Sequence, residues 1–392
     1  MTLISEILSV HDELTTWRHD LHAHPELAFN ENRTSAFVVE KLESWGIEAT
    51  QGVGVTGVVG TLKVGTSNRS IGLRADMDAL PMEELNTFAH KSKHPGCMHG
   101  CGHDGHTVML LAAARYLAQS KNFNGTVHFI FQPAEEANDN GSGAQAMIDD
   151  GLFNRFPMDS IFAMHNMPGL PEGTFSISDG PVFAAMDLFD VTITGKGTHG
   201  ALPHTGIDTL LVCSHVITAW QSIVSRNIDP MQTAVLSATS IQAGDNWNVI
   251  PQTAVIKGTV RTFLPEVQAQ VRERLHAIAE QVAGAFGATA QVDYRQELPA
   301  TVNDAEQARQ AVTVARELVG EAQIKEGADA TRLMGSEDFS VLLQHKPGAY
   351  LLLGSGAGEG VCMIHEARYD FNDKLLPIGA SFFARLVEQK LA

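Results

Sequence analysis

Two spacings of hydrophobic residues alternate along the first part of the chain. Residues 33–45 and 105–119 carry apolar side chains three and four positions apart, which predicts helices, and Gly46 ends the first of them. The start of the chain, Met1 to Trp17, has the pattern of one amphipathic helix, and a further helix is expected at 142–150. Short apolar or β-branched runs predict strands at 55–62, 70–75, 126–131 and 160–164. Such alternation predicts an α/β fold, a mainly parallel sheet with helices on both faces.

The middle of the chain follows a different rhythm. Its elements are expected to be a half-exposed strand, a helix, two strands, a long amphipathic helix and a last strand, at 187–194, 209–225, 234–242, 254–263, 266–286 and 288–294. The order β-α-β-β-α-β predicts a ferredoxin-like unit. We therefore expect an inserted domain at 185–295 within a first domain made of 1–184 and 296–392. An apolar strand at 349–354 and helices near 304–318 and 377–391 complete that first domain.

Length and charge narrow the class of protein. A chain of 392 residues exceeds the size at which a single core usually keeps growing, so two domains are expected. The formal net charge of -18 argues against a nucleic acid or an anionic membrane as a partner. The N-terminus lacks a signal peptide, no apolar run is long enough to span a bilayer, and only four cysteines occur. These features predict a soluble cytoplasmic protein.

The residues with the strongest chemical signal lie at 98–106, where MHGCGHDGH places one thiol, three imidazoles and one carboxylate just before a helix. A turn at Gly102 would let Cys101 and His103 point at one place, and Asp104 would serve as the helix N-cap. Either residue alone is more often a packed thiol or a hydrogen-bonded imidazole. Together, and close to the acidic pair described next, they predict a metal site.

Two adjacent acids, Glu135 and Glu136, follow the buried strand at 126–131. Neighbouring side chains diverge, so one can bind a metal while the other moves protons. The carboxylates of a glycosidase lie on opposite sides of the scissile bond, so adjacent acids fit metal hydrolysis better. His165 and His365 also follow predicted strands, and the carboxyl ends of parallel strands meet at one edge of a sheet. We therefore expect all these groups in one cluster.

The chain resembles a known family over nearly its full length. The motifs that carry the resemblance occur in order: RADMDALPM (74–82), MHGCGHDGHT (98–107), FQPAEE (131–136), MHNMP (164–168), GKGTHGALPH (195–204), NVIP (248–251) and GSEDF (335–339). Together they are similar to the aminoacylase/carboxypeptidase G superfamily of metallohydrolases. Within it, they resemble the branch of hippurate hydrolases, N-acyl-amino-acid amidohydrolases and auxin-conjugate hydrolases.

The resemblance implies a role for each matching position. It implies that Glu135 is the general base and later the acid, and that the inserted domain is a lid and a dimerisation module. His199 would reach the oxyanion from the partner subunit, and Asn248 and Arg261 would hold the substrate near its carboxylate. Asp78 and Asp104 would orient the metal ligands without binding metal themselves. The residues implied to bind two divalent ions are Cys101, His103, Glu136, His165 and His365. Zn²⁺ and Mn²⁺ suit these ligands, as do Co²⁺ and Ni²⁺.

These residues predict a two-metal amidohydrolase that cleaves N-acyl-amino acids and forms a homodimer or a higher homo-oligomer. A dipeptidase or aminopeptidase of the same superfamily and a metal-dependent binding protein without activity are the alternatives. The loop at 137–144 is longer and more polar than the Gly-rich stretch of relatives, which leaves the preferred acyl group and amino acid open. Glu26 is expected to be structural, as are His22 and His24, and Cys97 and Cys362 have no assigned role.

Overall fold

The chain forms two compact units. The computed structural model describes residues 1–137, 141–358 and 360–392, so part of the polar loop at 137–144 lies outside the described residues. The first unit contains 1–182, 302–332 and 338–392, and the second contains 183–301 and 333–337. Among the described residues, none of the helices combines the length and the apolar character needed to cross a membrane.

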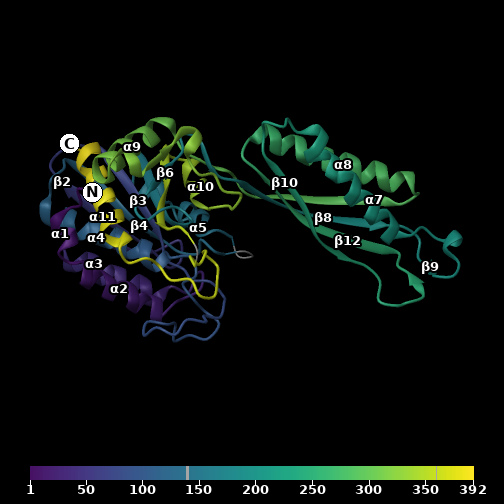
Figure 1. Cartoon of the computed structure of the whole chain (residues 1–392), viewed down its shortest axis with the longest axis horizontal. Coiled ribbons are helices and arrows are strands. Elements are labelled where there is room, and N and C mark those ends of the chain that lie inside the picture. The colour runs from purple at the N-terminus through teal and green to yellow at the C-terminus, as the bar shows by residue number, and fades with distance from the viewer. Residues whose placement is uncertain (138–140, 359) are drawn as a thin grey trace. The chain divides into compact units, whose positions relative to one another are not determined.

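An eight-stranded sheet with the order β1-β2-β4-β3-β5-β16-β6-β15 forms the centre of the first unit (Figure 1). The four central strands β4, β3, β5 and β16 run parallel, whereas β2 and β6 pair with them in the antiparallel sense. The prediction of a mainly parallel sheet is therefore confirmed. The strands span β1 Glu48–Val53, β2 Gly57–Val64, β3 Ser70–Asp76, β4 Gly125–Gln132, β5 Ser160–Pro168, β6 Phe175–Ile177, β15 Ile324–Glu326 and β16 Gly348–Gly356. Strand β14, Thr301–Val302, pairs with β7, Pro181–Phe183, in a separate ladder.

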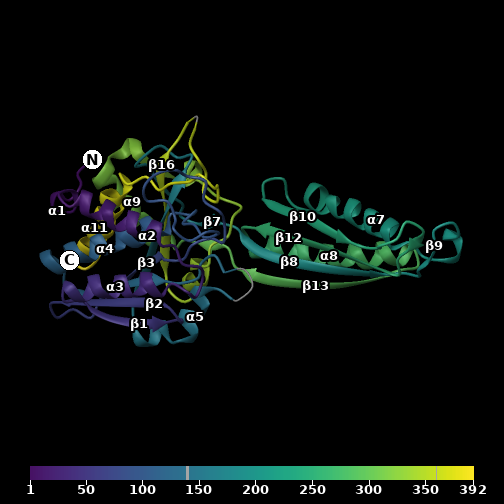
Figure 2. The same ribbon diagram turned by 90° about the horizontal axis from the view of Figure 1, so that it is seen from below.

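Helices cover both faces of this sheet because alternate strand residues face opposite sides. Ile71, Leu73 and Ala75 of β3 belong to the main hydrophobic cluster, where α4 and α11 lie side by side (Figures 1 and 2). Arg74 faces the other side, where its guanidinium donates to Asp338 just before α10. The helices span α1 Ser5–Leu8, α2 His11–Ala23, α3 Asn32–Ser44, α4 His103–Ser120, α5 Gly143–Asp149, α6 Leu152–Arg155, α9 Ala305–Val319, α10 Phe339–Leu343 and α11 Leu375–Lys390.

The N-terminal segment differs from the single helix predicted for Met1 to Trp17. It forms α1 and α2, separated by Ser9 and Val10, and Val10 has a non-helical backbone. The Ser9 hydroxyl donates to the Glu6 carbonyl at 2.8 Å, a local bond that competes with helix continuation. The hydrophobic spacing continues across this break, so periodicity alone did not reveal it.

The second unit contains one four-stranded antiparallel sheet of order β10-β12-β8-β13. Residues of β8 alternate between buried and half-buried, and α7 and α8 pack together against one face of the sheet (Figure 1). A short ladder joins β9 to β11. A π-helical turn at Ile223–Asn227 ends the helix predicted for 209–225. The elements span β8 Ala185–Thr194, β9 Thr198–His199, α7 Thr209–Ser222, β10 Ala234–Gln242, β11 Val249–Ile250, β12 Thr253–Thr262, α8 Pro265–Ala285 and β13 Thr289–Leu298.

Candidate metal centre

The ends of the central strands and the start of α4 bring six side chains of the first unit together. Three groups each place one ligand atom per residue within 4.8 Å of the others. The groups are Cys101–His103–His165, Cys101–Glu136–His365 and His103–Glu135–Glu136. Because the groups share members, all five implied ligands and the implied base belong to one cluster. His165 lies within β5, not after the strand as the sequence suggested.

A left-handed turn at Gly102 lies between Cys101 and His103, whose ligand atoms lie within 4.8 Å of each other, as the sequence predicted. Gly102, the N-cap of α4, has φ +95, which glycine adopts without strain. A Cβ on Gly102 would lie 2.3 Å from Asn166 Oδ1 and 2.8 Å from the Tyr369 hydroxyl, so a side chain has no room there. The helix therefore begins at His103, one residue before the predicted cap Asp104.

The histidine ring nitrogens are arranged as metal ligands require. His103 Nδ1 donates to the Asp78 carbonyl at 2.9 Å, and His165 Nδ1 donates to the Asn166 carbonyl at 2.6 Å. Their Nε2 atoms are left to face the cluster, where His103 Nε2 is buried without a hydrogen-bond partner and His165 Nε2 lies 3.3 Å from Cys101 Sγ. A backbone acceptor on one ring nitrogen is the usual support for a metal bound to the other. The donor set therefore fits divalent metal ions.

His106 has a different task, although Asp76, His103 and His106 also lie close enough to hold an ion. Its Nδ1 lies 2.6 Å from an Asp76 carboxylate oxygen, and its Nε2 lies 2.6 Å from Asn166 Oδ1 and 3.1 Å from the Asn166 backbone nitrogen. Both ring nitrogens are thus engaged by protein groups. We infer that His106 and Asn166 support the neighbouring ligands and do not bind metal themselves.

Burial and carboxylates control the protonation of the cluster. Burial raises the pKa of Cys101 well above its ordinary value, and the carboxylates of Glu136 and Glu135 raise it further. Burial lowers the pKa of His103, but the nearby carboxylates of Asp76 and Asp78 outweigh this effect and raise it to about 10. Without a metal, the protein therefore holds a neutral thiol and an imidazolium at neutral pH.

The two acids follow a strained turn. Ala134, in this turn, has φ +52 and is fully buried. The implied ligand His365 also has a left-handed backbone, with φ +64. Such left-handed residues cost about 1–3 kcal/mol and persist where surrounding groups hold them. Beyond the turn, the Glu136 amide donates to Asp78 at 2.9 Å, and His365 Nε2 lies 3.0 Å from Glu136. Asp78 thus contacts two implied ligands, which agrees with a supporting role.

Asp104 lies in the first turn of α4 and contacts side chains of α2. Its carboxylate accepts from His22 Nδ1 at 2.9 Å and lies 3.6 Å from the buried Arg18 guanidinium. Burial lowers the pKa of His22, yet its hydrogen bonds to Asp104 and Glu84 raise the value to about 9. The His22–Asp104 pair therefore joins α2 to the helix that carries His103.

A second buried network behind the acids was not predicted as functional. The Asp338 carboxylate accepts from Arg74, from Gln132 at 2.8 Å and from the Ser142 hydroxyl at 2.8 Å. Arg74 also donates to Asp76 at 2.6 Å. This network ties β3 and β4 together immediately before the acidic turn. Asp338 stands in the GSEDF motif, which was the only sequence signal for it.

The implied substrate groups lie in the second unit and do not gather in one place. His199 is exposed on β9, and the Gly200 amide donates to the Asn248 carbonyl at 2.7 Å, so His199 and Asn248 are neighbours. His199 Nδ1 accepts from the Ala201 amide at 3.0 Å, which leaves the proton on Nε2. Arg261 lies near the other end of β12 and donates to the Ser336 hydroxyl at 3.0 Å.

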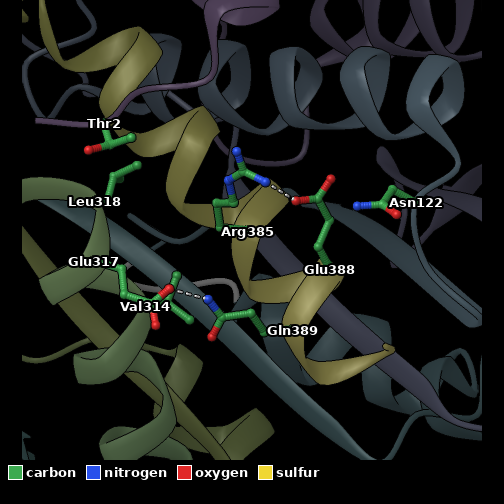
Figure 3. Close-up of a pocket in the computed structure, with 8 residues that line it drawn as sticks. All are labelled: Thr2, Asn122, Val314, Glu317, Leu318, Arg385, Glu388 and Gln389. Carbon is green, nitrogen blue, oxygen red and sulfur yellow. Dashed lines mark hydrogen bonds and ion pairs between the residues drawn. The ribbon is translucent and has the colours of Figure 1, made fainter.

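A separate cavity of about 400 Å³ lies among Thr2, the C-terminal part of α9 and the last turns of α11 (Figure 3). Its polar groups pair with each other: Arg385 donates to Glu388, and Gln389 donates to Glu317, both at 2.6 Å. None of the metal-ligating groups found among the described residues includes a residue of this cavity. The cavity is therefore not part of the metal centre.

Comparison with known proteins places this geometry in a family. Residues 72–389 match Peptidase family M20/M25/M40. The chain is 42% identical to the hippurate hydrolase of Campylobacter jejuni, over 98% of both proteins. It is 41% identical to the N-acetyl-L-cysteine deacetylase of Bacillus subtilis, over 86% of this chain and 79% of that protein.

A solved structure agrees with these sequence matches. It is a dinuclear metal binding peptidase of family M20 from Bacillus subtilis, with a TM-score of 0.85 and 34% identity over 98% of this chain and 99% of that one. The family match covers most of the chain, and the full-length relatives share its sequence at high identity. The chain therefore belongs to Peptidase family M20/M25/M40.

Proposed function

We propose that this protein is a binuclear metal-dependent amidohydrolase that cleaves N-acyl-amino acids to a carboxylic acid and a free amino acid. The observation that carries the proposal is the convergence of Cys101, His103, Glu136, His165 and His365 beside Glu135. Relatives named hippurate hydrolase and N-acetyl-L-cysteine deacetylase support this substrate class. The structural relative described as dinuclear supports two metal ions in the cluster.

Cys101 belongs to two of the ligand groups, one with His103 and His165 and the other with Glu136 and His365. This sharing supports two adjacent ion positions, which Zn²⁺ or Mn²⁺ would fill, or alternatively Co²⁺ or Ni²⁺. Bound ions of this kind polarise a carbonyl group and activate water for attack. Cys101, His103 and His165 are buried, which strengthens such electrostatic effects at their ligand atoms, whereas the side chain of His365 is half exposed.

Glu135 is the group in this cluster best placed for proton transfer. It stands next to the ligand Glu136, and one of its carboxylate oxygens lies within 4.8 Å of the ligand atoms of His103 and Glu136. We propose that it takes a proton from the attacking water and returns it to the departing amine nitrogen. A metal-binding protein without activity would have no need for this second acid.

The substrate carboxylate would be held by Arg261 of the second unit, which we propose to be a lid. A guanidinium offers a planar fork that matches a carboxylate. Burial lowers the pKa of Arg261, and the nearby Asp187 carboxylate opposes this effect. The protein thus holds a partly desolvated guanidinium whose remaining donors suit an anionic ligand. An aminopeptidase would instead need an acidic group for the free α-amine of its substrate.

The distances within the second unit favour a site shared between two copies. Arg261 and Thr253 are eight residues apart on β12, which at about 3.3 Å per residue separates them by about 26 Å. Strand β9, which contains His199, lies beyond the Thr253 end of the sheet (Figures 1 and 2), and it pairs with β11, which begins directly after Asn248. One amino-acid substrate cannot reach both ends. We therefore propose that His199 acts on the substrate bound by the partner subunit, with its Nε2 proton donated to the oxyanion.

The edge strand β10 is the proposed dimer contact. It contains no charged residue, and Val235 and Ile241 on it are exposed, as are Leu210 and Leu211 of α7. An uncharged open edge is a template for pairing with another chain. The opposite edge, β13, carries Asp293, Arg295 and Glu297, charges that discourage such pairing.

The deciding experiment compares substrates and two acid variants. The metal-loaded protein should hydrolyse N-benzoyl or N-acetyl amino acids much faster than unblocked dipeptides. Glu135→Gln should lower kcat by about 10²–10⁴-fold with its metal content unchanged. Glu136→Gln is the matched variant and should lose metal as well as activity. Faster hydrolysis of dipeptides would favour the peptidase alternative, and near-normal turnover in Glu135→Gln would refute the proposed base.

A further inference from the structure

The turn that directs Glu135 and Glu136 depends on a distant acid. Ala134 is buried with a left-handed backbone, and its amide donates to Glu31 Oε1 at 2.8 Å. The Ala134 carbonyl accepts from the Gly143 amide at 3.0 Å. A Cβ on Gly143 would lie 1.7 Å from the Pro133 carbonyl oxygen, so α5 begins directly against the turn. The amide and the carbonyl of Ala134 thus both form hydrogen bonds with residues outside the turn.

The position of Glu31 in the sequence does not explain its side chain. Glu31 immediately precedes α3, where an acid commonly caps the helix, but its carboxylate makes no capping bond. Glu26 does this instead, accepting from the amides of Arg33 and Thr34 at 2.9 and 2.8 Å. The Glu31 carboxylate is therefore available for the acidic turn.

Glu31 is also an unusual buried acid. It is fully buried, and the ion pairs found among the described residues do not include it. Its second oxygen accepts from the Thr56 hydroxyl at 2.5 Å. Burial raises the pKa of Glu31 to about 7, with the Thr56 hydrogen bond acting in the opposite direction. Burying a carboxylate without a cation is unfavourable, so helix stability alone does not account for this residue.

We propose that Glu31 is a positioning residue: its carboxylate holds the left-handed turn at Ala134 and so directs Glu135 and Glu136 toward the metal centre. The inference rests on the proposed function, because it takes Glu136 as a ligand and Glu135 as the base. It adds a residue of the N-terminal segment that does not contact the metal and acts only through the Ala134 backbone.

The first test replaces the carboxylate. Glu31→Ala removes the acceptor of the Ala134 amide, and we expect kcat for an N-acyl-amino acid and Co²⁺ affinity each to fall about 10–100-fold, as for other residues that support metal ligands. Co²⁺ affinity is read from the visible absorption of the bound ion and does not depend on turnover. Glu31→Gln keeps an oxygen for the Ala134 amide and offers its NH₂ to Thr56, so it should stay within threefold of the wild type.

The second test asks whether Glu31 acts through the turn. Glycine adopts positive φ as readily as negative φ, so Ala134→Gly lets the turn form without outside support. The double variant Glu31→Ala/Ala134→Gly should recover at least fivefold in kcat and Co²⁺ affinity over Glu31→Ala. Glu26→Ala is the matched control: it removes the cap of α3 and should lower Tm with kcat and Co²⁺ affinity unchanged.

Three results would overturn the inference: Glu31→Ala with normal kcat and Co²⁺ affinity, no recovery in the double variant, or equal losses in Glu26→Ala. If Glu31→Ala does not fold, Glu31→Leu, which keeps the volume without an acceptor, takes its place in every comparison. Failure of the proposed function looks different: the wild type would not hydrolyse N-acyl-amino acids, while the Co²⁺ comparison of Glu31 variants would still report on the turn.

Discussion

At the scale of single residues, hydrogen bonds to the backbone decide which atoms face the metal centre. His103 and His165 each donate Nδ1 to a main-chain carbonyl, and this leaves Nε2 toward the cluster. Cys101 and His103 are held protonated when no metal is bound, by burial in one case and by nearby carboxylates in the other. A metal ion binds only thiolate and neutral imidazole, so binding must displace both protons.

Proton release on metal binding tests this picture. Loading the metal-free protein at pH 7 should release about two protons per chain, one from Cys101 and one from His103. Isothermal titration in two buffers with different ionisation enthalpies measures the number. Cys101→Ala should release about one proton fewer, and affinity should rise with pH. Release of less than one proton from the wild type would contradict the assigned protonation states.

At the scale of elements, the metal centre depends on the side-chain hydrogen bonds that hold helices and strand ends together. α2 is joined to α4 by the bond between His22 and Asp104, and β3 and β4 are joined through Arg74 and Asp338. These contacts fix the first turn of α4 and the strand end that precedes Glu135. Among the described residues, neither His22 nor Asp338 shares a ligand group with the five proposed ligands, although a carboxylate oxygen of Asp338 lies within 4.8 Å of one of Glu135.

The His22–Asp104 pair predicts a pH dependence of stability. The pKa of His22 in the folded protein is raised to about 9 from an ordinary value of 6.5. Its contribution is therefore complete below pH 6.5 and is lost as the pH rises to about 9, an upper limit of about 3 kcal/mol. Urea unfolding of the metal-free protein between pH 6 and 9.5 should show this loss. His22→Asn should flatten the slope, while the exposed His204→Asn should keep it; equal slopes would refute the linkage.

At the scale of the whole molecule, we propose that a second copy completes the site. His199 and Arg261 lie toward opposite ends of one sheet, so each would serve a different substrate in a dimer. The open edge of β10 supplies an uncharged surface for this pairing.

Mixing inactive variants tests the shared site. His199→Ala and Glu135→Gln should each be nearly inactive, and an equilibrated mixture should regain up to about a quarter of normal activity, because one site of a mixed dimer is intact. Ile241→Lys on β10 should lower the dimer fraction in sedimentation experiments, whereas Thr289→Lys on β13 should not. Absence of recovery in mixtures that do exchange subunits would place His199 outside the partner's site.

Local sequence determined much of this protein. Periodicity located the parallel strands and the long helices, because side chains that share a face recur at the period of the element. The residue types at Cys101, His103, Glu135 and Glu136 pointed to metal chemistry because thiol, imidazole and carboxylate groups are the side chains that bind such ions. The rule that parallel strands end at one edge accounts for their gathering.

Only the tertiary structure decided what surrounds these groups. The close approach of Asn166 and Tyr369 to Gly102 and the support of Ala134 by Glu31 are contacts between residues far apart in the chain. Hydrophobic spacing records which face of an element is buried, but it carries no information about which distant acid accepts a given amide. Hydrophobic spacing also does not show how far apart His199 and Arg261 lie. That separation follows from the pairing of β12 in its sheet.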